Sequence, residues 1–195
     1  MLIVNKLLWY SGFLMRKAFQ IGFLILGLFW GFVPAGMPAE NFDENSAPIK
    51  TVDLQVCTDD KLQVKFLCNP DWELETEDNA MLIVISEDPV VTLTIAKSKS
   101  PVIFLEQLTK ETLAEMGQYT DGFTQETAQF AGHEAVKVQG VPKEFPEIRL
   151  LDHYVLYDLS LYSVLFSVNP KEKFDDYAAL FNKIAESFTF VEKVE

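Results

Sequence analysis

Short segments in which apolar and polar residues alternate dominate the chain, and this pattern constrains the fold most strongly. Alternation with a period of two is typical of half-buried β-strands. Eight such strands are predicted, at residues 52–56, 62–68, 81–86, 90–96, 124–130, 134–141, 148–157 and 161–168. Most of them adjoin another strand directly, so we expect a mainly antiparallel sheet rather than parallel β-α-β units.

Two segments with helical spacing interrupt the strands. Ser100 and Pro101 supply a cap and a first-turn proline, and the apolar spacing then continues to Gly117. Asn169 and Pro170 likewise supply a cap and a first-turn proline before a second helix. The apolar stripe of that helix is Phe174, Tyr177, Phe181, Ile184 and Phe188. The order strands, helix, strands, helix predicts the α+β class, with a mainly antiparallel β-sheet flanked by helices.

The first two strands are predicted to form a hairpin whose register places the cysteines far apart. One apolar face results from the pairs Val56 with Leu62, Leu54 with Val64 and Val52 with Phe66, and Asp59 and Asp60 then serve as turn residues. In this register Cys57 and Cys68 lie about 23 Å apart along the ladder. A disulfide needs Cα atoms within about 7 Å. We therefore expect Cys68 as a buried apolar residue and Cys57 as an exposed thiol, without an intramolecular bridge.

The N-terminal residues 1–39 have the layout of an export leader. Two basic residues, Arg16 and Lys17, precede an apolar run from 18 to 33, and small residues follow before the first acid, Glu40. This layout predicts a secretory signal peptide cut after Ala35 or Ala39, with translation starting at Met1 or at Met15. The alternative is that the run remains as a membrane anchor, because it approaches the length of a membrane span.

Charge separates the leader from the rest of the chain. All 29 Asp and Glu residues lie from Glu40 onward, together with 13 of the 16 Lys and Arg residues, so this part carries a net charge of −16. Such a surface repels nucleic acid and anionic lipid headgroups. The polar, aperiodic residues 40–50 are predicted to form a flexible tether, and residues 51–191 the folded domain.

Several short motifs in this domain resemble the PsbP-like family. The sequence Cys68-Asn69-Pro70-Asp71-Trp72 after a hairpin is similar to the opening of PsbP-like domains. The helix after the fourth strand, the Gly132-His133-Glu134-Ala135 corner, the aromatic hairpin and the terminal Ser187-Phe188-Thr189-Phe190 also match. The likeness covers about residues 50–191 and implies the Mog/PsbP α/β/α sandwich.

The resemblance also implies a location and a class of function. Members of the family are extracytoplasmic domains, and most have no known chemistry. Some are extrinsic or assembly subunits of photosystem II in the thylakoid lumen, and others are periplasmic or lipid-anchored. The photosynthetic members are partly associated with calcium or manganese. These properties are expectations for this chain.

Trp72 and four carboxylates follow one another after the hairpin. Pro70 cannot donate to a central ladder, so it marks a strand end, and we expect Trp72 to fold back over the core, with ligand stacking as the alternative. The metal candidates are Asp71, Glu73, Glu75 and Glu77, which fall on alternate positions. A strand would project them to one side, where calcium or manganese could find oxygen ligands. The competing interpretation is a solvated strand edge.

The two histidines have structural explanations beside functional ones. His133 lies in a predicted turn, and His153 lies beside Asp152 in an aromatic strand, where it could bind a metal or carry a proton. The sequence contains no nucleophile elbow, phosphate loop, HExxH or CxxC, so we predict that the protein is not an enzyme.

These observations predict a non-catalytic accessory protein. It is expected to be exported to the bacterial periplasm or the thylakoid lumen and to bind or help to assemble a membrane complex through a protein partner. The alternative is a periplasmic protein that binds a small molecule or a calcium or manganese ion. Membrane contact is expected only through an uncleaved leader.

Overall fold

The computed structural model describes residues 53–99, 105–108, 110, 113 and 116–191. The predicted leader 1–39 and tether 40–50 lie outside these residues, as do the cap and first-turn proline at 100–101. No helix within the described residues has both the length and the apolar character that a membrane span requires.

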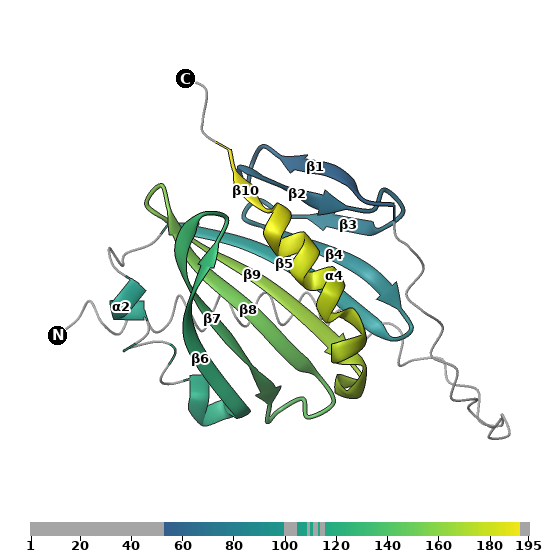
Figure 1. The fold of residues 1–195 in the computed structure, drawn as a ribbon, viewed down its shortest axis with the longest axis vertical. Coiled ribbons are helices and arrows are strands. Elements are labelled where there is room, and N and C mark those ends of the chain that lie inside the picture. The colour runs from purple at the N-terminus through teal and green to yellow at the C-terminus, as the bar shows by residue number, and fades with distance from the viewer. Residues whose placement is uncertain (1–52, 100–104, 109, 111–112, 114–115, 192–195) are drawn as a thin grey trace, which may run out of the picture. The chain divides into compact units, whose positions relative to one another are not determined.

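Two antiparallel sheets make up most of the described chain (Figure 1). The larger has the strand order β3-β4-β5-β9-β8-β7-β6, and the smaller has the order β1-β2-β10. The strands are β1 Gln55–Asp59, β2 Val64–Cys68, β3 Glu73–Thr76, β4 Ala80–Glu87, β5 Val90–Lys99, β6 Thr120–Phe130, β7 His133–Pro142, β8 Arg149–Tyr157, β9 Ser160–Asn169 and β10 Thr189–Phe190. All of their pairings are antiparallel. The predicted α+β class with a mainly antiparallel sheet is therefore confirmed.

The C-terminal helix forms where its proline and apolar stripe predicted it. A 3₁₀ turn, η3 Lys171–Lys173, leads into α4 Phe174–Ser187. Within the predicted stripe, Phe174, Phe181, Ile184 and Phe188 are each at most 4% exposed, and Tyr177 is partly buried against the core. Asp175 and Asp176 lie in the first turn, where negative charge favours the helix dipole. The helix packs against β2 and β9 (Figure 1).

Only part of the predicted first helix is described. Within residues 100–117 the structure gives α2 Leu105–Leu108, and the 3₁₀ turn η2 Gly117–Tyr119 follows. Leu108 and Leu113 are buried. The remainder of this prediction falls largely outside the described residues.

Both sides of the large sheet are covered, and β8 and β9 supply side chains to each. On one side, which we call the α4 side, the core includes Leu151, Val155 and Phe166 with β2 and α4. On the other, which we call the 105–116 side, Val136, Val138 and Tyr154 pack with Leu108 and Leu113. Successive strand residues point to opposite faces, so neighbours along β8 enter different environments.

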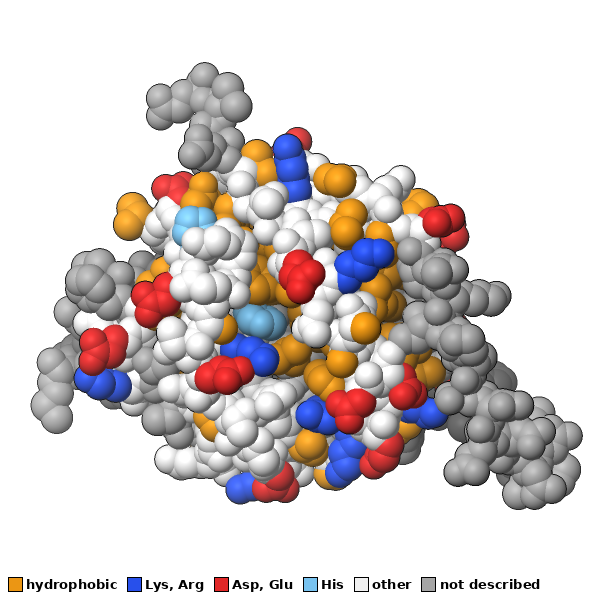
Figure 2. Space-filling view, in the orientation of Figure 1, with side chains coloured by type: hydrophobic (Ala, Val, Ile, Leu, Met, Phe, Trp, Pro, Cys, Tyr) orange, Lys and Arg blue, Asp and Glu red, His pale blue; other side chains and the backbone are white. Residues whose placement is uncertain are grey.

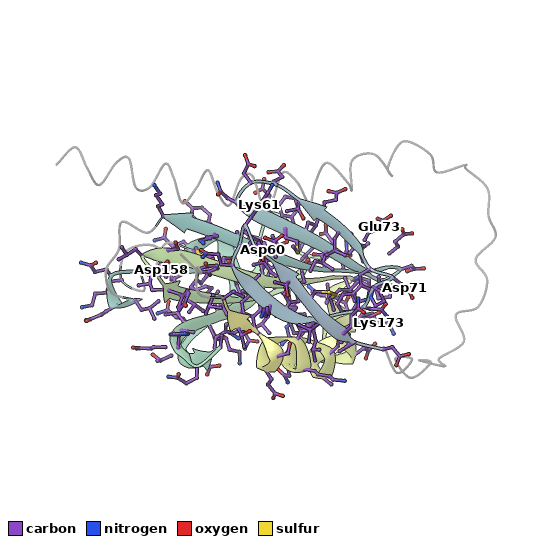
Figure 3. All side chains as sticks on the ribbon, turned by 90° about the horizontal axis from the view of Figure 1, so that it is seen from above. Asp60, Lys61, Asp71, Glu73, Asp158 and Lys173 are labelled. Carbon is purple, nitrogen blue, oxygen red and sulfur yellow. A yellow bond between two sulfur atoms is a disulfide. The ribbon has the colours of Figure 1, made fainter. Side chains whose placement is uncertain are left out.

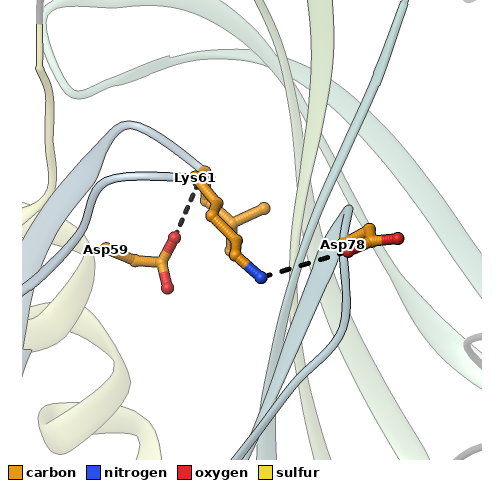
Figure 4. A network of polar contacts seen from close by, with 4 residues as sticks. Asp59, Lys61 and Asp78 are labelled. Atoms are coloured by element: carbon orange, nitrogen blue, oxygen red, sulfur yellow. Dashed lines mark hydrogen bonds and ion pairs between the residues drawn. The ribbon is translucent and has the colours of Figure 1, made fainter.

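The register predicted for the first hairpin is wrong. In the structure Cys57 pairs with Phe66 and Asp59 with Val64, so the loop covers residues 60–63. Asp59 Oδ1 accepts a hydrogen bond of 2.7 Å from the backbone N–H of Leu62, and Lys61 Nζ lies 4.0 Å from Asp78 Oδ1 (Figure 4). The prediction placed Leu62 in the strand because it is apolar, whereas it is a fully buried loop residue.

The prediction that the two cysteines stay apart is also wrong. Cys57 and Cys68 form a disulfide with a Cα–Cα distance of 5.8 Å. The actual register sets Cys57 opposite Phe66, two residues from Cys68 on the same face. Cys57 packs partly buried against the core and is not an exposed thiol.

Two hairpin turns agree with the sequence. Ala131 and Gly132 both have positive φ between Phe130 and His133, which confirms a tight turn at this corner. Asp158 and Leu159 also have positive φ and form a tight turn between Tyr157 and Ser160, as predicted from Asp158. Positive φ at both loop residues fits the twist of the flanking strands.

Candidate functional site

The predicted carboxylate row lies at an edge of the large sheet. Glu73 and Glu75 occupy alternate positions of the edge strand β3 and are exposed. Asp71 lies in a turn, where its backbone N–H donates to Asn69 Oδ1 at 2.8 Å. Figure 3 shows Asp71 and Glu73 at the outside of the molecule. Glu77 follows the strand, and its backbone N–H donates to Ala80 O at 2.8 Å.

Among the described residues, no group of three or more His, Cys, Asp or Glu side chains is placed to hold a metal ion. The calcium or manganese site at Asp71, Glu73, Glu75 and Glu77 stays a prediction.

Trp72 is part of the core. It is 8% exposed and packs in the α4-side cluster, and its backbone N–H donates to Asn69 O at 3.1 Å. The Asn69-Pro70 segment therefore makes the turn that returns Trp72 over the core, as predicted.

His133 packs among aromatic rings beside its turn. The ring centroid lies 5.0 Å from that of Tyr157 and 5.5 Å from that of Phe190. These edge contacts give the side chain a packing role at the end of the hairpin.

His153 lies on the α4 side of the large sheet and is 8% exposed. Its ring centroid lies 4.8 Å from that of Phe130, and its Nδ1 is buried without a hydrogen-bond partner in the described structure. Burial lowers the pKa of His153 to about 4, and the charge of Lys137 on the neighbouring strand adds to this effect. The imidazole is therefore neutral at pH 7.

A polar row crosses the sheet beside this histidine. Lys137 pairs with His153 across β7 and β8 and with Glu126 across β6 and β7. Lys137 Nζ lies 2.9 Å from Glu126 Oε1. Histidine, basic and acidic side chains are visible on the face of the molecule seen in Figure 2.

Asp152 is buried on the opposite side of the same strand. Ser163 Oγ lies 3.0 Å from Asp152 Oδ1 and 2.9 Å from Oδ2, and Tyr154 also hydrogen-bonds the carboxylate. Burial raises the pKa of Asp152 to about 6, although these hydrogen bonds oppose the shift. Burial, and then the charge of Asp152, raises the pKa of Tyr154 well above its usual value.

The sequence identifies Asp152 only as a neighbour of His153. The partnership with Ser163 and Tyr154 was missed, although an acid inside an otherwise apolar strand was a signal that a partner must exist. Since Asp152 and His153 project to opposite sides of the sheet, they do not form a dyad.

An open depression lies at another part of the large sheet. Its volume is about 360 Å³. It is lined by Asp121, Gly122, Gln139, Gly140, Val141, Arg149, Lys171 and Glu172. These residues come from β6, β7, β8 and η3, and none of them was predicted from the sequence as a site residue.

Comparison with protein-family models and with curated proteins gave no match. Solved structures do match. A crystal structure from Bacteroides thetaiotaomicron has a TM-score of 0.50 at 10% identity and covers 72% of this chain, which spans about half (49%) of that protein. This likeness shows a shared fold alone.

Two further solved structures that match are of named proteins. The Ran-binding protein Mog1p of Saccharomyces cerevisiae has a TM-score of 0.47 at 11% identity, covering 73% of this chain and 97% of its own. Cyanobacterial PsbP (CyanoP) from Synechocystis sp. PCC 6803 has a TM-score of 0.46 at 15% identity, covering 75% and 97%.

Proposed function

We propose that this protein is a non-catalytic, extracytoplasmic binding or assembly accessory protein that acts at a membrane complex. The Cys57–Cys68 disulfide is the observation that best supports the proposed extracytoplasmic location. Disulfides form and persist in oxidising compartments such as the periplasm and are rare in the cytosol. The leader pattern in residues 1–39 supports the same location.

The placement of the titratable residues supports binding rather than catalysis. Asp152 and His153 have strongly displaced pKa values, yet they lie on opposite sides of the large sheet. Two groups separated by a sheet cannot act on one substrate as an acid and a base, because each must reach the proton that it transfers.

Charge supports a protein partner with a basic or neutral surface. The chain from Glu40 onward has a net charge of −16. Complementary charge steers association and is screened by salt. We therefore expect the partner to bind faster at low ionic strength than at high ionic strength.

Thiol trapping in the native organism tests the proposed location. Intact cells that produce the full chain with a C-terminal tag are fractionated in the presence of a maleimide reagent that adds mass to free thiols. We expect the protein in the extracytoplasmic fraction, modified only after reduction. A Cys57→Ser/Cys68→Ser variant is the control that stays unmodified. A cytoplasmic protein with two free thiols would contradict the proposal.

Metal-ion binding at the carboxylate row is a second candidate. The exposed, alternate carboxylates Glu73 and Glu75 favour it, and Trp72 precedes them as a reporter. Calcium or manganese at millimolar concentration should then change Trp72 fluorescence or the melting temperature. A Glu73→Gln/Glu75→Gln variant should lose the response. No response to either ion in the parent protein would remove this candidate.

A further inference from the structure

We propose that the open depression among β6, β7, β8 and η3 binds a small zwitterion of the size of an amino acid or a dipeptide. Its volume of about 360 Å³ lies within the range of small-molecule sites. It brings together residues from distant parts of the chain, including Asp121, Gln139 and Lys171, which lie 18 and 32 positions apart. The site lies away from the carboxylate row and does not depend on the proposed accessory function.

Two glycines shape the backbone around the depression. Gly122 has a φ of +61°, and the pairing of β6 with β7 is irregular between Asp121 and Thr124. A Cβ atom at Gly140 would lie 2.4 Å from Thr120 Cγ2 and 3.0 Å from Asp121 O. The start of β6 therefore passes close to β7 at a position where a side chain would clash. Bulges of this kind commonly redirect a strand beside a binding site.

The cationic residues of the depression suit a carboxylate. Arg149 is oriented by Asp175, with Nη1 3.2 Å from Oδ1, and its guanidinium lies 4.5 Å from the ring centroid of Phe174. A guanidinium has five N–H donors, so the contact with Asp175 leaves several available. Lys171 has no side-chain hydrogen bond or ion pair among the described residues, so its ammonium group is available as well.

The acidic residues of the depression suit an ammonium group. Glu172 follows Lys171, and Asp121 lies on β6 with Lys143 Nζ 3.8 Å from its Oδ1. The lining thus carries two positive and two negative side chains. A net charge of −16 on the chain from Glu40 onward repels simple anions, whereas a zwitterion has no net charge to repel. This balance favours a ligand with both a carboxylate and an ammonium group.

Calorimetric titration of the full chain tests the proposal. The probes are glycine and glycylglycine, with acetate and methylamine as ligands that carry only one of the two charges. We expect saturable binding of at least one zwitterion in the millimolar range or tighter, and at least tenfold weaker binding of both single-charge ligands. Acetate binding as tightly as glycylglycine, or no binding of either zwitterion at 20 mM, would overturn the proposal.

Variants locate the binding in the depression. Lys171→Gln should weaken zwitterion binding at least fivefold, because it removes a cation without removing a structural contact. Lys173→Gln is the matched control, since Lys173 lies on the same turn and its Nζ lies 3.5 Å from Asp176 Oδ2 outside the lining. Glu172→Gln should weaken glycylglycine binding and leave acetate unchanged. Equal affinities in the Lys171 and Lys173 variants would show that the ligand binds elsewhere and would overturn the assignment.

Discussion

The two sides of the large sheet each bury one of two adjacent residues of β8, and this burial shifts the pKa values of the two residues in opposite directions. Asp152 is 5% exposed on the 105–116 side, and His153 is 8% exposed on the α4 side. Burial raises the pKa of the carboxyl to about 6 and lowers the pKa of the imidazole to about 4. Each side therefore favours the neutral form of the group it encloses.

The consequences for stability have opposite signs. Between pH 6.5 and about 4 the unfolded chain protonates His153 while the folded chain does not, so acid favours unfolding. Between pH 3.8 and about 6 the folded chain keeps the proton on Asp152 while the unfolded chain loses it, so rising pH favours unfolding. The two windows overlap between about pH 4 and 6, where the contributions offset each other.

A comparison of adjacent core residues should show the largest effect. Phe166 is fully buried on the α4 side, with its ring centroid 4.5 Å from that of Phe181. The preceding residue, Leu165, is only half-buried on the other side. We expect Phe166→Ala to lower the free energy of unfolding by about 4 kcal/mol and Leu165→Ala by less than half of that. Urea denaturation at pH 7 measures both. An equal or larger loss in Leu165→Ala would mean that the α4 side is not the main core.

Replacement of His153 should remove the loss of stability that this residue causes as the pH falls. The variant His153→Phe has no titrating side chain beside Phe130. Relative to the parent protein, this variant should gain about 3 kcal/mol of stability as the pH falls from 6.5 to 4. Denaturation curves across this range give the difference. A constant difference between the two proteins would show that the imidazole titrates normally.

Replacement of Asp152 should change the pH dependence of stability in the opposite direction. Relative to the parent protein, Asp152→Asn should gain up to about 3 kcal/mol as the pH rises from 3.8 to 6. The hydrogen bond from Ser163 can be kept by the amide oxygen, so the fold should persist. Denaturation curves over this pH range measure the gain in stability. A stability profile of Asp152→Asn that runs parallel to that of the parent protein would contradict the raised pKa.

The smallest effect is expected at the rim of the α4 side. Lys137→Gln removes a positive charge that lowers the pKa of His153, so this pKa should rise, and the stability change should stay below about 1 kcal/mol. Nuclear magnetic resonance titration of the His153 ring measures the shift. Lys183→Gln on the exposed face of α4 is the control and should leave the His153 pKa unchanged. An unchanged pKa in Lys137→Gln as well would exclude this electrostatic contribution.

Local patterns predicted the strands and the C-terminal helix well because their signals lie within short stretches. Alternation located β4 to β9, and Pro170 with its apolar stripe located α4. The first hairpin failed because Leu62 and Gln63 look like strand residues yet form a buried loop. Tyr162 Oη donates to Leu62 O at 3.0 Å across 100 residues, and such a contact has no local signature.

The site residues were harder to predict than the strands. β8 is buried on both sides, so its residues show no alternation that would assign Asp152 and His153 to opposite faces. Ser163 is 11 positions from Asp152, and only the β8–β9 pairing joins them. The depression likewise depends on the register of three strands, whereas the carboxylate row was visible because it lies within one segment.

Affinity isolation of the tagged full chain from gently solubilised membranes of the native organism tests the proposed accessory role most directly. We expect one membrane complex to co-purify at a reproducible ratio and to dissociate as the salt concentration rises, because acidic surface charge contributes to the association. A protein that is recovered alone at low salt, without any membrane component, would contradict the accessory role.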